Sequence, residues 1–332
     1  MDGICTLAND AVYDQLIALL NSIEVIQGQN MPVCVYPYDD NIEKIAAEIA
    51  KRPNVQLYAD KESIQRWDDF VRSAWDAHPT ALQEWRKIGK ETYYRLGCHR
   101  RFCAFDAPFE RFIYMDADTL LMKPVDNIFS LLDSNDWVVY DFQHKEPMYV
   151  YNIASPKLLE IFPLEKIQTQ IFCSGLYASK KNIFSQETKE WLLARLRAGE
   201  AEILYPMAPD QSLLNYMMMR AGILCYNLAL KLPPDEITGC CVTSPHFEER
   251  ENILYDKNQR LTYIHYIGIP AKVFTRLCAG ENLDFRYRDV FLYYRYLHEP
   301  EKKPKFKNKP KPYDAPPSFI ERVLRKLGFF HG

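Results

Sequence analysis

The chain has 332 residues, of which 48% are hydrophobic and 14% aromatic, and this composition excludes an intrinsically disordered polypeptide. The formal net charge of −3 gives no general reason to expect a nucleic acid partner. We expect no membrane-spanning segment, because no run of about 18 apolar residues occurs, and no signal peptide, because Met1-Asp2-Gly3 carries no basic charge.

The nine cysteines include no Cys-x-x-Cys pair, and several of them, such as Cys5 and Cys34, have apolar neighbours. This pattern predicts reduced, buried thiols and a cytoplasmic location rather than a disulfide framework. The adjacent Cys240 and Cys241 are either a redox-active pair or two packed thiols in a short strand.

The N-terminal part of the chain predicts a parallel sheet covered by helices. Residues 4–8, 33–36 and 55–58 read as strands, while helical spacing of apolar residues begins after Asn9-Asp10 and recurs over residues 42–51. This alternation is typical of α/β nucleotide-binding folds but specifies no reaction. A dinucleotide or P-loop site is not supported, because neither glycine-rich motif follows the first strand.

The central stretch, residues 112–122, reads Phe-Ile-Tyr-Met-Asp-Ala-Asp-Thr-Leu-Leu-Met and follows a mostly helical region at residues 62–105. Four apolar or aromatic residues lead into Asp116 and Asp118, as in a buried strand that presents two carboxylates at its carboxyl end. Ligands bind at that edge of open α/β sheets, and both carboxylates can reach one hard cation there. The alternative is an acidic turn that caps the next helix.

Two further strands are expected at residues 137–140 and 171–178, and a helix at residues 186–198. The second of these strands carries the segment Phe172-Cys173-Ser174-Gly175. These elements extend the predicted sheet beyond its parallel beginning.

Another helix begins at Pro209-Asp210-Gln211, where the Asp and Gln side chains can simply complement the helix dipole. Residues 261–267 read as a late strand that contains His265 and is followed by Gly268 and Lys272. A lone histidine is more often structural than a metal ligand, and only the Gly and Lys that follow His265 favour a ligand role for it.

The C-terminal residues 299–332 differ from the rest, with nine Lys and Arg against four Asp and Glu, a net charge of +5. Residues 299–313 are rich in Lys and Pro and are expected to be extended or mobile. After Ser318, one face of a short predicted helix is apolar and the other basic. This segment either docks on an anionic membrane surface or packs on the protein body.

In this order the motifs resemble glycosyltransferase family 8, the group of glycogenin and the bacterial lipooligosaccharide galactosyltransferases, over residues 4–272. The chain also looks like a cyanobacterial branch of that group. The resemblance implies the GT-A fold, a Rossmann-like α/β fold whose mixed, mostly parallel sheet has helices on both faces. It further implies a catalytic domain at residues 1–298, with residues 299–332 as a linker and an amphipathic helix.

The resemblance implies an activity and a site. The activity is a metal-dependent, retaining transfer of a hexose from a UDP-sugar to a glycan or lipid-linked acceptor. Asp210 and Gln211 are the implied catalytic residues, and Asp116, Asp118 and His265 the implied metal ligands. The nucleotide-sugar donor is expected to contact Leu7, Ala8, Asn9, Tyr13, Arg100, Asp116, Ala117, Asp118, Ser174, Gly175, Gly268 and Lys272.

Two departures from the family pattern affect the sugar and phosphate ends of this site. The segment that contains Cys173 replaces the family's Phe-Asn-Ala-Gly, whose amide reaches the sugars. Lys272 follows His265 by seven residues, where the family usually has six.

The residue types of the site fit the chemistry of the implied reaction. Two carboxylates and an imidazole suit Mn2+, with Mg2+ as the alternative, and a divalent metal neutralises a leaving diphosphate. Asp210 is a better nucleophile than Gln211.

Two other functions stay open. The Asp116-x-Asp118 pattern also occurs in haloacid-dehalogenase-like phosphatases, although there it lies on the first strand and has Thr or Val where this chain has Leu120. A non-catalytic protein that binds a nucleotide sugar or a glycan is the third possibility. The sequence does not identify the acceptor, although aromatic residues such as Tyr38 and Tyr149 lie in predicted loops where rings can stack on sugars.

Overall fold

The computed structural model describes residues 1–315 of the chain. The amphipathic helix predicted after Ser318 lies outside these residues. Within the described part, no helix is both long enough and apolar enough to cross a bilayer.

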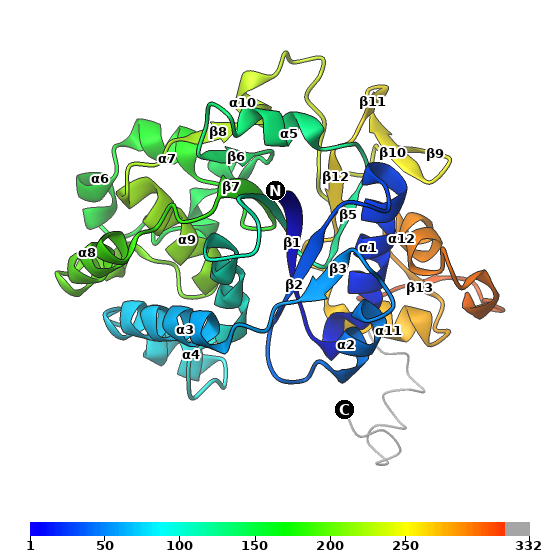
Figure 1. The fold of residues 1–332 in the computed structure, drawn as a ribbon, viewed down its shortest axis with the longest axis horizontal. Helices are drawn as coiled ribbons and strands as arrows, with labels where there is room; N and C mark the ends of the chain where they lie inside the picture. The colour runs from blue at the N-terminus through cyan, green and yellow to red at the C-terminus, as the bar shows by residue number, and fades with distance from the viewer. Residues whose placement is uncertain (316–332) are drawn as a thin grey trace.

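A seven-stranded mixed sheet forms the centre of the molecule, in the order β3-β2-β1-β4-β7-β6-β8 (Figure 1). All neighbouring strands are parallel except β7, which runs antiparallel to β4 and β6. The expected mixed, mostly parallel α/β sheet is therefore confirmed. The strands are β1 (Asp2–Ala8), β2 (Val33–Pro37), β3 (Val55–Leu57), β4 (Arg111–Met115), β6 (Trp137–Val139), β7 (Leu176–Lys180) and β8 (Cys225–Asn227).

Alternate side chains of each strand enter two hydrophobic cores, one on either face of the sheet. On β1, Cys5 and Leu7 join the first core, whereas Ile4 and Ala8 join the second. The first core packs under α3 (Lys61–Asp76), the 3-10 helix η2 (Leu96–Phe105), α8 (Gln186–Arg197) and α9 (Pro209–Arg220). The second packs under α1 (Tyr13–Gln27), α2 (Glu43–Ile49), α5 (Asp126–Leu131) and α10 (Leu228–Lys231).

The central stretch forms two strands instead of one. After β4 the backbone turns at Asp116, whose carbonyl accepts hydrogen bonds from the amide (3.0 Å) and hydroxyl (2.7 Å) of Thr119. The chain then continues as β5 (Thr119–Leu121), which leaves the main sheet and pairs antiparallel with β12 (Tyr263–His265). The two carboxylates thus lie in the turn between two sheets.

The strand predicted at residues 171–178 is wrong in its first half, because β7 begins only at Leu176. The Asn215 side chain of α9 accepts from the amide of Phe172 and donates to its carbonyl, both at 2.9 Å. A side chain therefore satisfies the backbone groups that a neighbouring strand would otherwise bond. The helical region 62–105 also divides, into α3, α4 (Ala81–Lys87) and η2.

A third hydrophobic core joins the C-terminal part to the rest, as α11 (Ala271–Cys278) and α12 (Arg288–Arg295) pack beside α1 (Figure 1). Residues 299–313 are not a free linker, because Phe306 and Tyr313 pack on this core. The segment contains η6 (Pro300–Lys302) and β14 (Lys311–Pro312), which pairs with β13 (Leu283–Asp284). The division at residue 298 stays a prediction.

The remaining elements are short and connect the larger ones. They are η1 (Asp10–Val12), η3 (Gln143–Lys145), η4 (Pro147–Tyr149), α6 (Lys157–Ile161), α7 (Leu164–Gln170), η5 (Glu200–Ile203), β9 (Glu248–Arg250), β10 (Ile253–Asp256) and β11 (Gln259–Arg260).

Candidate active site

The turn after β4 is held from both sides by backbone hydrogen bonds. The amide of Asp116 donates to the carbonyl of Gly175, just before β7, at 2.9 Å. The carbonyl of Asp118 accepts from the amide of Tyr266, just after β12, at 2.9 Å. The turn is therefore fixed at the carboxyl edge of the main sheet, where open α/β sheets bind their ligands.

Asp116, Asp118 and His265 form a cluster whose ligand atoms all lie within 4.8 Å of one another. The imidazole Nε2 of His265 is 3.3 Å from Oδ1 of Asp118. Gly175 makes room for this imidazole, since a Cβ there would lie 2.4 Å from the Cε1 atom of His265. Two carboxylates and one imidazole are ligands that fit Mn2+, and the oxygen atoms also suit Mg2+.

The charges in this cluster are coupled. Burial raises the pKa of Asp116, and the Arg101 guanidinium offsets that rise only in part. Burial opposes ionisation of Asp118, but the charge of His265 outweighs it and lowers the pKa of Asp118. Burial also disfavours the imidazolium form of His265, yet the Asp118 carboxylate holds the pKa of His265 above its usual value. A metal on this cluster therefore competes with the imidazolium proton.

Arg101 is the basic residue of the site. Its buried guanidinium lies 3.0 Å from Oδ1 of Asp116 and 3.1 Å from Oδ2 of Asp210, and it also donates to the carbonyls of Cys98 and Ser174. The predicted Arg100 points elsewhere: it pairs with Asp68 at 3.2 Å. Of the two adjacent arginines, Arg101 therefore lies beside the carboxylates of the site, and the donor contact of Arg100 stays a prediction.

Asp210 and Gln211 open α9 beside the carboxylate cluster. Burial acts against ionisation of Asp210, but Arg101, then Arg95 and His99, outweigh it and lower its pKa to about 2. The amide oxygen of Gln211 accepts from the backbone of Ser174 at 3.0 Å, and its amide nitrogen donates to the carbonyl of Tyr149 at 3.0 Å. Asp210 is therefore an ionised carboxylate in the site, whereas the Gln211 amide holds neighbouring loops together.

A cavity of about 330 Å³ opens beside the carboxylate turn. Six of the predicted donor-binding residues line it, namely Leu7, Ala8, Asn9, Asp116, Ala117 and Asp118. Gly268 and Lys272 lie outside its lining, although their neighbours Ile269 and Ala271 are part of it. Tyr13 lines a different cavity. The side chain of Asn9 is engaged, because it donates to Asp39 at 2.8 Å and caps η1.

Asp141, Cys173 and Cys241 complete the surroundings of His265. Asp141 is not among the residues predicted from the sequence. Burial raises the pKa of Asp141 to about 7, although its carboxylate accepts from the amides of Gln143 and Cys173. His265 lowers the pKa of the Cys173 thiol against the larger, opposite effect of burial. Asp141 follows a predicted strand just as Asp116 does, and that position after a strand was the signal available for it.

All nine cysteines lie in the described residues and are free thiols, as expected. The Sγ atoms of Cys240 and Cys241 are 3.7 Å apart. The hydrogen bond from Cys240 lowers the pKa of Cys241 to about 7, against the effect of burial.

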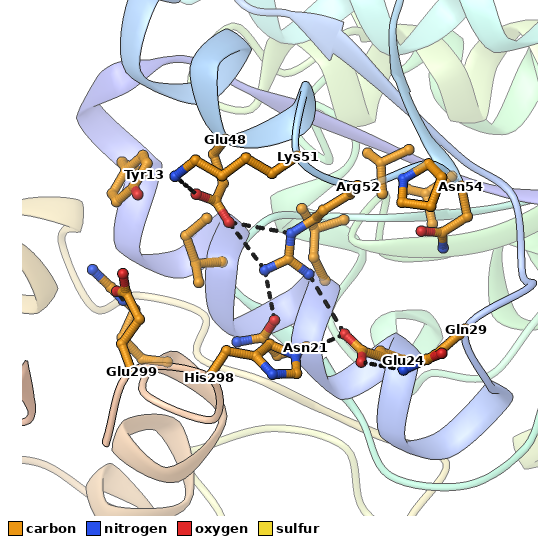
Figure 2. Close-up of a pocket in the computed structure, with 16 residues that line it drawn as sticks. Tyr13, Asn21, Glu24, Gln29, Glu48, Lys51, Arg52, Asn54, His298 and Glu299 are labelled. Carbon is orange, nitrogen blue, oxygen red and sulfur yellow. Dashed lines mark hydrogen bonds and ion pairs between the residues drawn. The ribbon is translucent and has the colours of Figure 1, made fainter. Parts of the chain in front are cut away.

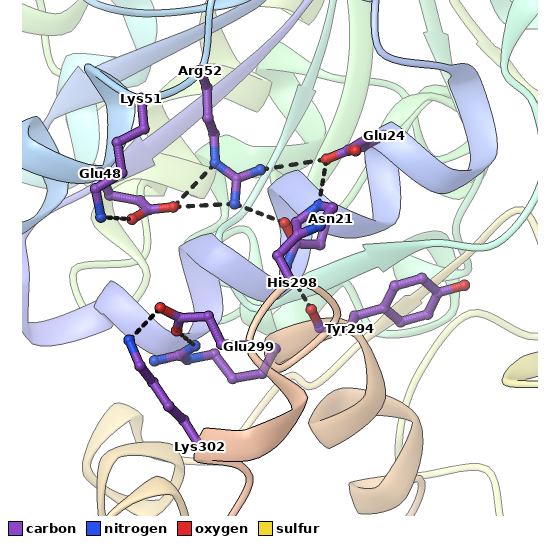
Figure 3. A network of polar contacts seen from close by, with 10 residues as sticks. Asn21, Glu24, Glu48, Lys51, Arg52, Tyr294, His298, Glu299 and Lys302 are labelled. Atoms are coloured by element: carbon purple, nitrogen blue, oxygen red, sulfur yellow. Dashed lines mark hydrogen bonds and ion pairs between the residues drawn. The ribbon is translucent and has the colours of Figure 1, made fainter.

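A larger cavity, of about 440 Å³, lies away from this site, beside α1 and the beginnings of β2 and β3 (Figure 2). Its charged residues pair with one another: Arg52 bonds to Glu48 and Asn21, and His298 bonds to Glu24 at 2.9 Å (Figure 3). These pairs join α1 and α2 to the segment after α12. We interpret this cavity as part of the packing between those elements.

Comparisons with known proteins support the fold. No protein-family model matches the chain, and no curated protein matches its sequence. A solved structure of the bifunctional glycosyltransferase WbbM, in its apo form, matches with a TM-score of 0.53 and 14% identity, over 91% of this chain and 51% of that one. The chain thus spans about half the length of WbbM.

Two further solved structures match less closely. The galactosyltransferase LgtC, in complex with donor and acceptor sugar analogs, has a TM-score of 0.49 and 16% identity, over 83% of this chain and 94% of that one. Mouse xyloside xylosyltransferase 1, in its apo form, has a TM-score of 0.47 and 12% identity, over 69% and 85% of the two chains. None of these matches supports a cyanobacterial branch. The sheet order and the WbbM match show that the chain has the α/β fold of the GT-A glycosyltransferases.

Proposed function

We propose that the protein is a divalent-metal-dependent glycosyltransferase that takes a hexose from a UDP-sugar with retention of configuration. The observation that carries this proposal is the cluster of Asp116, Asp118 and His265, whose two carboxylates line a 330 Å³ cavity, with the ionised Asp210 nearby. The shared fold with a glycosyltransferase supports it.

The cluster fits the metal that this reaction needs. Asp116, Asp118 and His265 would hold Mn2+ or, as the alternative, Mg2+. The metal would neutralise the negative charge that develops on the leaving diphosphate. The room that Gly175 leaves for the imidazole is specific support, because any side chain at that position would displace His265 from the carboxylates.

The other residues have separate roles in this proposal. Leu7, Ala8 and Asn9 line the cavity at the end of β1 and would contact the nucleotide. Asp210 would face the anomeric carbon as nucleophile or as a stabilising charge, and Arg101 keeps it ionised and fixed. Lys272, exposed in the first turn of α11, and Gly268 would contact the phosphates.

The donor contacts of Tyr13, Arg100, Ser174 and Gly175 also stay predictions, because these residues, like Gly268 and Lys272, lie outside the cavity lining. The acceptor is a glycan or a lipid-linked sugar, and we retain the proposals of a cytoplasmic location and of membrane docking through the C-terminal residues.

Calorimetric titration of UDP, with and without Mn2+, tests the donor site in the wild-type protein and in Asp118→Asn. We expect binding that requires both the metal and Asp118. Asp69→Asn, on the exposed side of α3, is the matched control and should bind as the wild type does. A protein that binds no nucleoside diphosphate under any condition is not a transferase of this kind. If UDP binds, hydrolysis of a panel of UDP-sugars then identifies the sugar.

A further inference from the structure

A second arginine lines the proposed donor cavity. Arg95 immediately precedes η2, and its side chain lies in the lining together with Tyr38 and Cys98. Its backbone has a φ of +54°, in the left-handed region that few residues with side chains adopt. Such backbone strain persists only where the surrounding structure imposes it, and it is found most often at functional sites.

The two arginines of the cavity differ in what they already bind. Arg101 is buried, and its nitrogen atoms bond to Asp116, Asp210, Ser174 and Cys98. It therefore has little capacity left for a ligand. Arg95 is exposed to the cavity and forms no ion pair with any of residues 1–315.

The groups around Arg95 leave its guanidinium without a direct ion pair among residues 1–315. Cys98, which lies with Arg95 in the cavity lining, is an uncharged thiol, because burial raises the pKa of Cys98 to about 11. Asp210 is close enough to interact with Arg95, but the Asp210 carboxylate is already paired with Arg101. Arg95 thus presents to the cavity a guanidinium that forms no ion pair within residues 1–315, although the charge of Asp210 attracts it.

We propose that Arg95 binds the carboxylate of an acidic sugar, either a hexuronate on the nucleotide donor or a sugar acid on the acceptor. This inference rests on the proposed function. A guanidinium is the side chain best shaped to grip a carboxylate through two parallel hydrogen bonds. In the proposed function, the metal that Asp116, Asp118 and His265 would hold neutralises the diphosphate, which leaves Arg95 for a different anion.

The donor test compares matched pairs of ligands that differ only in the carboxylate. UDP-glucuronate and UDP-glucose, and UDP-galacturonate and UDP-galactose, are titrated with Mn2+ into the wild type, Arg95→Gln and Arg86→Gln. Arg86 is an exposed arginine of α4 whose ion pair is with Glu91, so its variant is the matched control. If Arg95 binds a donor carboxylate, we expect the wild type and the control to bind each UDP-uronate about tenfold more tightly than the matching neutral UDP-sugar. Arg95→Gln should lose that preference, while its affinity for UDP stays unchanged.

The acceptor test adds methyl glucuronide or methyl glucoside to the protein saturated with UDP and Mn2+. An Arg95-dependent preference for the glucuronide here assigns the carboxylate to the acceptor. The inference is overturned if neither test shows an Arg95-dependent preference, or if Arg95→Gln weakens the binding of UDP itself, since Arg95 would then serve the phosphates. If the wild type does not bind UDP at all, the proposed function is overturned as well. Failure of the proposed function can therefore be told apart from failure of the inference about Arg95 alone.

Discussion

Gly175 positions a metal ligand through the side chain that it lacks. In Gly175→Ala, the new methyl group would overlap the imidazole of His265 and push it away from Asp118. We expect the affinity for Mn2+ to fall about tenfold or more, as for other residues that orient a metal ligand. Titration of Mn2+ into the protein in the presence of UDP measures this.

The control for this variant is Gly3→Ala, where a Cβ would overlap Phe109 at the opposite end of the sheet. It should lower the thermal stability and leave the Mn2+ affinity unchanged. Equal metal affinity in Gly175→Ala and the wild type would show that His265 is not a ligand.

Arg101 lies between the half-buried carboxylate of Asp116 and the buried carboxylate of Asp210, which would otherwise repel each other. In Arg101→Met, Asp116 and Asp210 lose their shared cation, and we expect the free energy of unfolding to fall by about 3 kcal/mol. Urea denaturation measures the loss. Adding Asp210→Asn to Arg101→Met should recover part of it, because one buried charge is then absent. A double variant no more stable than Arg101→Met would contradict this account.

The sequence indicated the residues of the candidate site better than the directions in which their side chains point. Asp116, Asp118, His265 and Asp210 come from distant parts of the chain, and the structure brings them together. The choice of Arg100 over Arg101 depended on a spacing of one residue. In a 3-10 helix one residue rotates the side chain by about 120°, and only packing of η2 on the sheet decides which arginine faces the carboxylates.

Individual elements were predictable where their periodicity was strong, as in β1, α1 and β2. The break between β4 and β5 was not, because apolar residues continue on both sides of Asp116-Ala117-Asp118 and the chain changes sheet within that run. The segment before β7 was also misassigned. Its backbone bonds to the side chain of Asn215, a long-range contact that local sequence cannot show.

Helix α1 is fixed to the segment after α12 by Glu24 (Figure 3). Burial alone would raise the pKa of Glu24, but hydrogen bonds from His298 and Gln29 lower it. A lowered pKa means that the carboxylate stabilises the fold above its unfolded pKa of about 4.3, and that this stabilisation disappears as the pH falls through the folded value. Glu24→Gln should therefore lose about 0.5 kcal/mol at pH 6, a small amount because solvent screens the pair.

The same difference between Glu24→Gln and the wild type should shrink at pH 3, as measured by urea denaturation at both pH values. Glu236→Gln, an exposed carboxylate, is the control and should not change stability at either pH. A difference that persists undiminished at pH 3 would mean that packing of the side chain, and not its charge, joins the two elements.

At the scale of the whole molecule, residues 299–315 and 316–332 should behave differently when they are removed. Phe306 and Tyr313 pack on the third core, and the amide of Lys311 bonds to Asn282 at 3.0 Å. Deletion of residues 299–332 therefore exposes apolar surface and should lower the thermal midpoint by several degrees. Deletion of residues 316–332 leaves these contacts in place and should lower it less.

The shorter deletion then tests membrane docking in a protein that keeps the contacts of Phe306 and Tyr313 with the third core. Residues 316–332 contain the apolar positions of the amphipathic pattern, whereas the six lysines of residues 302–311 remain. Lysines alone attract an anionic surface weakly and in a salt-dependent way, but buried apolar side chains make the attachment stable. At 0.15 M salt we therefore expect the wild type to sediment with anionic liposomes and the shortened protein to stay in the supernatant. Equal sedimentation of both, or of neither, would remove the membrane surface from the partners of this protein and favour a water-soluble glycan as the acceptor.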